Sequence, residues 1–320
     1  MRILIAGGAG CLGSNLIEHW LPKGHQIMVI DNFATGKREV VPSVNGLTVV
    51  EGDIADFQLV SSTFKNFKPE VVVHSAAAYK DPDNWIEDTK TNVIGSINVA
   101  KATKECGAQR LINFQTALCY GRPNQLPIPV SHPTAPFTSY GITKTAGEQF
   151  MLMSGSPTLS LRIANVTGPR LAIGPIPTFY KRLKAGQACF CSDSSRDFLD
   201  MSDFLSFMDI AIHPGSATGV FNVSSGEAHS IKEIFDIVSQ YLKLGKMDVP
   251  INPVLDDDVP IVVLDPTQTN AVFNWKSRVS FVETIQRQLA WYDQYGISDV
   301  FSHLKPAAQK IGISNVGSYL

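Results

Sequence analysis

The sequence predicts an α/β protein in which a doubly wound parallel sheet is followed by a smaller, mixed α/β region. Two observations support this fold class. In the first half of the chain, short β-rich runs alternate with helical patterns, which is typical of βαβ units and a parallel sheet. Beyond Gly168, prolines and glycines become frequent and the alternation is lost. We therefore expect one domain over residues 1–167 and a second over 168–320, with some later segments returning to the first.

The expected elements of the first domain follow in a regular order. A strand over Arg2–Ala6 precedes a helix over Leu12–Leu21, whose apolar residues share one face and which Pro22 and Gly24 end. The further expected strands are Gln26–Ile30, Thr48–Glu51, Val71–His74, Arg110–Gln115 and Thr158–Ile163. The further expected helices are Leu59–Phe67, Thr91–Cys106 and Tyr140–Met153. About six parallel strands would complete the sheet.

Composition narrows the class of protein. The 320 residues are 44% hydrophobic and 18% charged, which is enough apolar material for a packed core. The 27 basic and 29 acidic residues leave a net charge of −2, so a nucleic-acid partner is not expected. Five irregularly spaced cysteines fit neither a disulfide framework nor a four-ligand zinc site, and they favour the reducing cytoplasm. The apolar opening Met1–Ala6 is too short for a membrane span, so no membrane partner is expected.

Three glycines lie between the first strand and the first helix. Gly7, Gly10 and Gly13 form a turn without side chains, where backbone N–H groups and the helix N-terminus can approach a pyrophosphate. Their GxxGxxG spacing differs from the GxGxxG pattern of dinucleotide-binding turns, and a purely structural turn is the alternative. The position between strand and helix favours a dinucleotide cofactor.

Asp31 ends the second strand, about 18 residues after Gly13. A carboxylate there accepts hydrogen bonds from ribose hydroxyls and repels a 2′-phosphate, which favours NAD over NADP. In the alternative interpretation, Asp31 is a turn residue beside Asn32, and Lys37 or Arg38 reaches a phosphate.

Small and polar residues follow the next two strands. The segments Gly52–Asp53–Ile54 and His74–Ser75–Ala76–Ala77 stand at the carboxyl ends of strands, where open α/β sheets bind ligands. We interpret His74 as a hydrogen-bonding residue at the strand end, because no carboxylate or metal-ligand spacing accompanies it.

Tyr140, Lys144 and Thr116 are the candidate catalytic residues. Tyr140 and Lys144 are four residues apart and share one helix face. A free tyrosine has a pKa of about 10, so a tyrosine base requires a nearby cation such as Lys144 or an oxidised nicotinamide. Thr116 follows a strand at its carboxyl edge, where its hydroxyl can orient the substrate. Taken singly, each of the three has a structural interpretation as a packing, solvated or capping residue.

These and other motifs together resemble the extended short-chain dehydrogenases/reductases, specifically the NAD-dependent nucleotide-sugar epimerase/dehydratase family, and are similar to UDP-glucose 4-epimerases. The resemblance covers nearly the whole chain and implies a Rossmann-type NAD-binding domain. The matching segments are Gly7–Gly13, Asp31–Asn32, Gly52–Asp56, His74–Ala77, Thr91–Gly95, Tyr140–Lys144, Arg162–Arg170 and Arg196–Phe198.

The resemblance implies a role for each candidate. Tyr140 takes a proton from a sugar hydroxyl while the nicotinamide accepts the hydride from the same carbon, and Lys144 and Thr116 assist. The expected cofactor contacts are Gly7, Gly10, Cys11, Leu12, Asp31, Asn32, Asp53, Ile54, Ser75, Ala76, Ala77, Asn92, Tyr140 and Lys144. Asn165 and Arg196 would meet the nucleotide diphosphate, with a capping role as the alternative for Asn165. No metal is expected.

The reaction class depends on the residues after Thr116. By the same resemblance, a 4,6-dehydratase of this family has the sequence Thr-Asp-Glu at the position of Thr116-Ala117-Leu118, and it uses the acidic pair to eliminate water. Neither Ala117 nor Leu118 can transfer a proton. We therefore expect a 4-epimerase acting on a UDP-hexose or UDP-hexuronate. The alternatives are a dehydratase or keto-reductase of the same family and a non-catalytic NAD-binding regulator.

Several positions depart from the family pattern. Gln115 and Cys119 replace a serine and a valine, and Asp256–Asp258 stand where a diphosphate-binding arginine is expected. We interpret Asp256–Asp258 as a solvated loop. The polar segment Lys80–Trp85 follows the fourth strand, and Lys80 is a candidate ligand for a sugar carboxylate, with a surface loop anchored by Trp85 as the alternative.

The resemblance also implies a homodimer built on the helices Thr91–Cys106 and Tyr140–Met153, which would form a four-helix bundle. Ile94, Ile97 and Val99 belong either to that interface or to the monomer core. The resemblance further implies a role in the synthesis of surface polysaccharides or of glycosylated metabolites.

Overall fold

A seven-stranded parallel sheet forms the centre of the computed structural model, which describes residues 1–79, 81–255, 258–297 and 300. The strand order is β11-β6-β5-β4-β1-β2-β3, and every neighbouring pair is parallel. The strands are β1 (Arg2–Ala6), β2 (Gln26–Asp31), β3 (Leu47–Glu51), β4 (Val71–His74), β5 (Arg110–Thr116), β6 (Thr158–Ile163) and β11 (Gly219–Val223). The predicted doubly wound α/β fold is confirmed.

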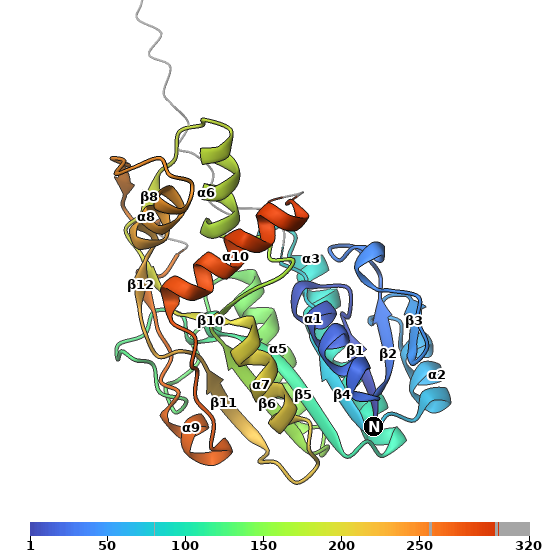
Figure 1. Cartoon of the computed structure of the whole chain (residues 1–320). Coiled ribbons are helices and arrows are strands. Elements are labelled where there is room, and N and C mark those ends of the chain that lie inside the picture. Colours follow the sequence, from blue (N-terminus) through green and yellow to red (C-terminus); the bar gives the residue numbers. More distant parts are fainter. Residues whose placement is uncertain (80, 256–257, 298–299, 301–320) are drawn as a thin grey trace, which may run out of the picture.

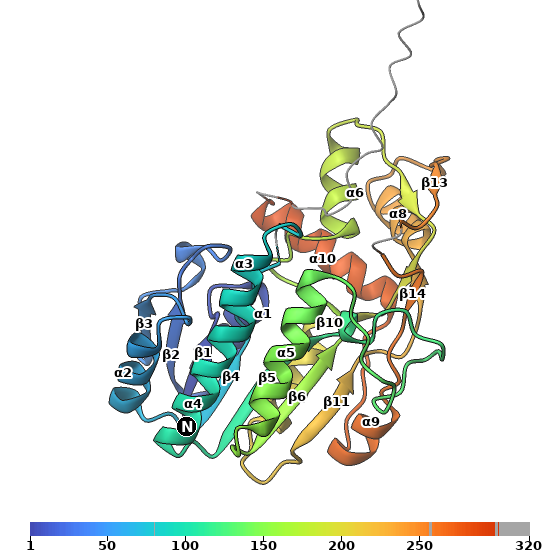
Figure 2. The ribbon, with the colours of Figure 1, turned by 180° about the vertical axis from the view of Figure 1, so that it is seen from behind.

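Helices cover both faces of this sheet. One face carries α1 (Cys11–Trp20) and α7 (Met201–Ala211), as Figure 1 shows. The opposite face carries α2 (Phe57–Phe67), α4 (Ser96–Cys106) and α5 (Ser139–Met153), as Figure 2 shows. In β1, Ile3 and Ile5 pack into the first helical layer and Leu4 packs into the second. Because both faces are buried, the strands are continuous apolar runs.

The seventh strand, β11, comes from beyond residue 168 and pairs with β6. This strand was not predicted from the sequence, in which Thr158–Ile163 was the last expected strand of the sheet. Arg110 at the start of β5 is fully buried and donates hydrogen bonds to the carbonyl of Ala211, at the end of α7, and to those of Ser216 and Ala217, between α7 and β11. These bonds connect the returning segment to the sheet.

The helix predicted over Thr91–Cys106 is built differently in the structure. A short helix, α3 (Trp85–Asp88), leads into a π-helical segment, Thr89–Gly95, and only then into α4. The Ser96 hydroxyl donates to the Asn92 carbonyl at 2.7 Å, and such side-chain bonds to the preceding turn often bend a helix. The backbone also approaches α5 closely here, because a Cβ at Gly147 would lie 2.3 Å from the Asn92 carbonyl oxygen.

A second core lies above the carboxyl ends of the strands (Figure 1). It consists of α6 (Pro175–Lys184), α8 (Ile231–Tyr241) and α10 (Phe281–Tyr295), which pack through buried aromatic and aliphatic side chains. The small elements around it are β7 (Asn165–Thr167), β8 (Cys191–Ser192), β9 (Ser195–Arg196), β10 (Phe198–Asp200), β12 (His229–Ser230), β13 (Ile251–Asn252), β14 (Ile261–Val262) and α9 (Thr267–Phe273). Across the described ranges, none of the helices has the length and apolar character that a membrane crossing requires.

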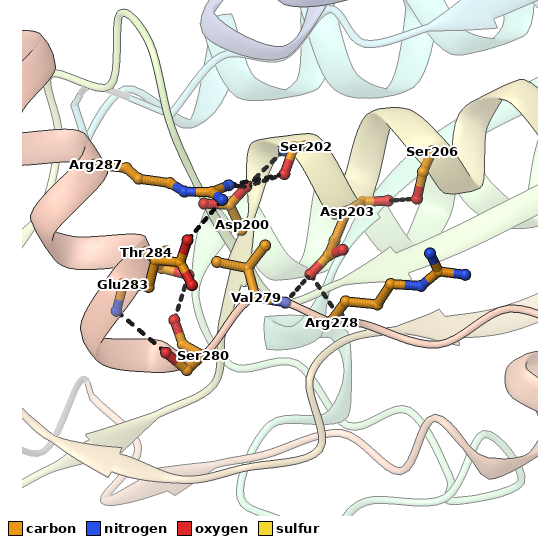
Figure 3. A network of polar contacts seen from close by, with 10 residues as sticks. All are labelled: Asp200, Ser202, Asp203, Ser206, Arg278, Val279, Ser280, Glu283, Thr284 and Arg287. Carbon is orange, nitrogen blue, oxygen red and sulfur yellow. Dashed lines mark hydrogen bonds and ion pairs between the residues drawn. The ribbon is translucent and has the colours of Figure 1, made fainter.

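Polar contacts join α7 to the segment that leads into α10 (Figure 3). The Asp203 carboxylate accepts hydrogen bonds from the backbone N–H groups of Arg278 and Val279 at 2.8 and 2.9 Å. The Arg287 guanidinium bonds to the Asp200 carboxylate at 3.4 Å. Since α7 packs on the sheet, these contacts fix α10 over the strand ends.

Candidate active site

The three glycines of the predicted cofactor turn have different structural roles. Gly7 has a φ of +83°, and a Cβ there would lie 2.4 Å from the backbone nitrogen of Ala76. A Cβ at Gly13 would lie 2.4 Å from the Gly7 carbonyl oxygen, whereas the nearest atom to one at Gly10 is 3.5 Å away. Gly7 and Gly13 are therefore required by packing, and Gly10 keeps the approach to the helix open.

The first turn of α1 has the features of an anion site. Gly10 is the N-cap of this helix and provides no side-chain hydrogen bond to it. The exposed N–H groups of a helix start favour a phosphate, so this geometry suits the predicted pyrophosphate contact of Cys11 and Leu12. The Cys11 thiol donates to the Pro169 carbonyl at 3.4 Å, and burial raises the pKa of that thiol to about 12. Cys11 is thus a neutral packing residue at the edge of the turn.

The Asp31 carboxylate stabilises the glycine turn through hydrogen bonds to the backbone. Its carboxylate accepts hydrogen bonds from the backbone N–H groups of Ala9 and Phe33, both at 2.8 Å. The guanidinium of Arg38 lies over the Phe33 ring at 5.2 Å. The Asn32 side-chain oxygen accepts a hydrogen bond from the backbone N–H of Ala34, two residues further along the same loop. Asp31 therefore has a structural function at the end of β2, beside the glycine turn, and its ribose contact stays a prediction.

Five further predicted cofactor residues follow β3 and β4: Asp53, Ile54, Ser75, Ala76 and Ala77. The Asp53 carboxylate forms an ion pair with Lys90 at 2.6 Å, so it is fixed against the helical segment before α4. The Ser75 hydroxyl donates to the Gly7 carbonyl at 3.0 Å. The segments after β1 and β4 are therefore in direct contact, as the predicted cofactor site requires.

Asn92 connects three parts of the site. Its side chain accepts from the backbone N–H of Ala78 at 2.9 Å and donates to the carbonyl of the same residue at 3.0 Å. It also donates to the Thr143 hydroxyl on α5 at 3.1 Å. His74, at the end of β4, is fully buried and bonds to the Ser96 hydroxyl at 3.0 Å. Asn92 thus fixes the segment after β4 relative to α5, behind Lys144.

Lys144 is buried, with 4% of its surface exposed. Its ammonium group donates to the Phe114 carbonyl of β5 at 2.6 Å. Burial lowers the pKa of Lys144 to about 8, although the Glu148 charge acts in the opposite direction. Lys144 is therefore still mainly cationic at neutral pH, and its position is set by the end of β5.

Thr116 and Tyr140 lie on neighbouring segments. The Thr116 hydroxyl oxygen accepts from the Leu118 N–H at 3.1 Å, which leaves its O–H free to act as a donor. Tyr140 lies in the first turn of α5, and a Cβ at Gly141 would lie 3.2 Å from the Leu118 carbonyl oxygen. The Gln115 amide donates to the Lys144 carbonyl at 3.0 Å. The structure therefore brings the elements of all three candidate catalytic residues together.

Two side chains beside Tyr140 were not predicted from the sequence. The Tyr79 ring meets the Tyr140 ring edge-on, with 6.4 Å between their centroids. The Asp88 carboxylate accepts a 2.6 Å hydrogen bond from Ser139, the residue before Tyr140. Burial raises the pKa of Tyr140 far above its usual value, and the charges of Tyr79 and Asp88 raise it further. No familiar motif contains Asp88, although Tyr79 borders the polar segment that begins at Lys80.

The predicted substrate residues lie on the small strands after β6. Asn165 on β7 donates from its side chain to the Asp197 carbonyl at 3.0 Å. The Arg196 guanidinium on β9 forms an ion pair with Asp258 at 2.6 Å. The interpretation of Asp258 as merely solvated is therefore wrong, because its carboxylate neutralises the expected phosphate ligand. Lys80 and residues 256–257 lie outside the described residues.

Comparisons with known proteins agree on one family. The family model described as "NAD dependent epimerase/dehydratase family" matches residues 3–224. The chain is similar to the Bordetella bronchiseptica enzyme WbmG, crystallised with NAD and UDP, at 67% identity and a TM-score of 0.91, covering 96% of this chain and 99% of that one. It is also similar to the Thermotoga maritima UDP-glucose 4-epimerase with UDP-glucose, at 26% identity and a TM-score of 0.84, with 92% and 99% covered. A Mycolicibacterium smegmatis UDP-glucose 4-epimerase is 28% identical over 311 residues, which are 91% of this chain and 98% of that protein.

Proposed function

The chain belongs to the NAD-dependent epimerase/dehydratase family, and we propose that it is a nucleotide-sugar 4-epimerase that acts through a transient 4-keto intermediate. The observation that supports this proposal is the contact between the segments that carry Thr116, Tyr140 and Lys144, because the first turns of α5 pack against the end of β5 and the residues that follow it. Residues 1–167 would hold the cofactor and most catalytic groups, and residues 168–320 would mainly hold the substrate.

NAD is the cofactor. The residues present fit it, because the space beside Gly10 is open and the first turn of α1 lacks a side-chain cap. The pyrophosphate would lie on the N–H groups of Cys11 and Leu12, and Asp31 would meet the adenosine ribose. A carboxylate at this position favours NAD over NADP. When bound, NAD accepts a hydride from the sugar and returns it.

The side chains of this protein would move the accompanying proton. Tyr140 accepts the proton of the sugar 4-hydroxyl and later returns it to the same oxygen. Lys144, held by the Phe114 carbonyl, supplies positive charge that favours the phenolate and holds the nicotinamide ribose. Thr116 donates a hydrogen bond to the reacting oxygen with its free O–H. Inversion at C4 follows when the keto sugar turns over before it is reduced.

The substrate we propose is a UDP-hexose or a UDP-hexuronate. This choice is supported by the UDP complex of the WbmG enzyme and by the UDP-glucose 4-epimerase names of other relatives. Arg196 would meet the diphosphate and Asn165 would lie beside it. Dehydration is not favoured, because Ala117 and Leu118 follow Thr116 where a proton-transferring pair is needed.

We also propose a homodimer in which α4 and α5 of two copies pack together. Large apolar side chains of α5 and of the segment before α4 are exposed: Ile94, Ile142, Phe150 and Met153, the last with 74% of its surface exposed. Figure 2 shows α4 and α5 side by side. Exposed apolar patches of this kind mark interfaces. Val99, in contrast, is fully buried in the monomer core.

The five cysteines are all free, which supports a cytoplasmic enzyme. Polysaccharide precursors would be its products.

The proposal is tested by incubating the purified protein and NAD with UDP-hexoses and UDP-hexuronates and following inversion at C4 by NMR. We expect inversion of at least one sugar and a loss of about a thousandfold or more in kcat for Tyr140→Phe. Tyr295→Phe, at the exposed end of α10, is the matched control and should leave kcat unchanged. Inversion at the wild-type rate in Tyr140→Phe would refute the proposed role of Tyr140.

A further inference from the structure

Asp88 is a buried carboxyl group that the proposed mechanism does not use. It lies at the end of α3, with 2% of its surface exposed. Among the described residues its carboxylate bonds only to the Ser139 hydroxyl, and no described cationic side chain forms an ion pair with it. A buried acid without a cation is costly, so its presence calls for an explanation.

Asp88 is connected to the catalytic helix. Figure 2 shows α3 and the start of α5 at the same edge of the sheet. Ser139 is the first residue of α5 and donates to Asp88 at 2.6 Å, and Tyr140 follows it directly. The other anchor of this turn is Thr138, whose hydroxyl oxygen accepts from the Gly141 N–H at 3.1 Å. Asp88 is therefore the side chain from outside α5 that holds the turn carrying Tyr140.

Two acidic groups, the Tyr79 phenol and the Asp88 carboxyl, affect the pKa of Tyr140. Burial is the largest cause of the raised pKa of the Tyr140 phenol. Tyr79, from the segment after β4, and Asp88, from α3, raise this pKa further. Burial raises the pKa of Asp88 as well, the Ser139 bond lowers it, and the nearby charges of Asp81 and Glu87 raise it. Lys144, the cation on α5, has its ammonium on the Phe114 carbonyl. A carboxylate at Asp88 thus opposes loss of the Tyr140 proton.

We propose that Asp88 is a positioning residue for Tyr140: its carboxylate anchors Ser139 and places a negative charge near the tyrosine, which stays protonated until bound ligand adds its positive charge to that of Lys144. The active base then forms only in the loaded site. This inference rests on the proposed function, because it takes Tyr140 as the base.

Two variants separate the charge from the hydrogen bond. Asp88→Asn removes the charge and keeps an oxygen that accepts from Ser139. Ser139→Ala removes the hydrogen bond and keeps the charge. The tyrosinate absorbance of the NAD-loaded protein is followed against pH, and the same curve for Tyr140→Phe is subtracted to isolate Tyr140. This measurement requires no sugar turnover.

We expect Asp88→Asn to move the Tyr140 midpoint to lower pH by about one pH unit, because the variant removes a negative charge that raises the pKa of Tyr140. The acid limb of the pH profile of kcat should move in the same direction. Ser139→Ala should leave the midpoint unchanged and lower kcat several-fold, since the first turn of α5 loses its anchor.

The proposal is overturned if Asp88→Asn leaves the midpoint in place, or if both variants move it equally. Circular dichroism and the melting temperature of each variant report whether it folds. A wild-type protein that inverts no UDP-sugar would contradict the proposed function, while the absorbance titration would still decide the effect of Asp88 on Tyr140.

Discussion

The proposed cofactor side and the proposed substrate side of this molecule are held together in different ways. On the cofactor side, Gly7, Asp31 and Ser75 fix the turn through short contacts between adjacent strand ends of one sheet. On the substrate side, Arg196 is fixed by Asp258, which is 62 residues away on a separate segment. The first arrangement follows from the regular order of strands and helices, which brings neighbouring strand ends together. The second depends on pairing between segments that are distant in the sequence. The cofactor side should therefore behave as a rigid scaffold, and the substrate side should tolerate change with effects mainly on binding.

We expect the largest loss of stability when the buried ion pair between α5 and β6 is broken. Glu148 on α5 bonds to Arg162 on β6 at 2.8 Å, and both side chains are buried. Glu148→Ala leaves the arginine charge unpaired, so we expect the free energy of unfolding to fall by about 4 kcal/mol. Asp236→Ala breaks the exposed Lys232–Asp236 pair on α8 and should cost about 0.3 kcal/mol. Urea denaturation measures both, and similar losses would contradict a rigid scaffold.

The glycine turn is the next place to test the scaffold. Gly7→Ala adds a Cβ that overlaps the Ala76 backbone at a positive φ, which should lower the free energy of unfolding by about 3 kcal/mol and weaken NAD binding. Gly24 has a φ of +79° with no atom within 4 Å of an added Cβ. Gly24→Ala should therefore cost only about 1 kcal/mol. Equal losses in the two variants would show that the close approach of the strand ends is unimportant.

Lys144 gives the cofactor side a pH dependence. An unfolded lysine holds its proton up to a pKa of about 10.4, while folded Lys144 has a pKa of about 8. Between these values the unfolded chain binds the extra proton, so the free energy of unfolding should rise with pH, by up to about 3 kcal/mol. Below pH 8 the buried charge lowers stability by a constant amount. Denaturation of wild type and Lys144→Met across this range measures the difference, and parallel curves would contradict the buried ammonium.

The smallest expected effect lies on the substrate side. Arg196→Ala should raise KM for the UDP-sugar about tenfold through loss of a charge-assisted bond, with little change in kcat. Asp258→Asn frees the guanidinium and should lower KM a few-fold. Steady-state kinetics with the best sugar from the panel provides the check. A fall in kcat without a change in KM for Arg196→Ala would place this arginine in the chemistry rather than in binding.

The same contrast explains how much the sequence could predict. The strands up to Ile163 and the glycine turn follow from apolar runs and local spacing, and the sequence analysis located them closely. The strand β11 was missed because its short segment becomes a strand by pairing with β6. The pairing of Asp258 with Arg196 and of Asp88 with Ser139 was missed for a similar reason, since no local pattern indicates which distant side chain a carboxylate will meet.

The central claim is that Tyr140 and bound NAD act on one carbon, C4 of the sugar. The most direct measurement follows the hydrogen at that carbon, using a UDP-hexose labelled with deuterium at C4 in ordinary water and NMR of the product. The account predicts a C4-inverted sugar that keeps its deuterium at C4, because the hydride leaves and returns to the same position. Loss of water from the sugar, or loss of the label from C4 to solvent, would contradict it.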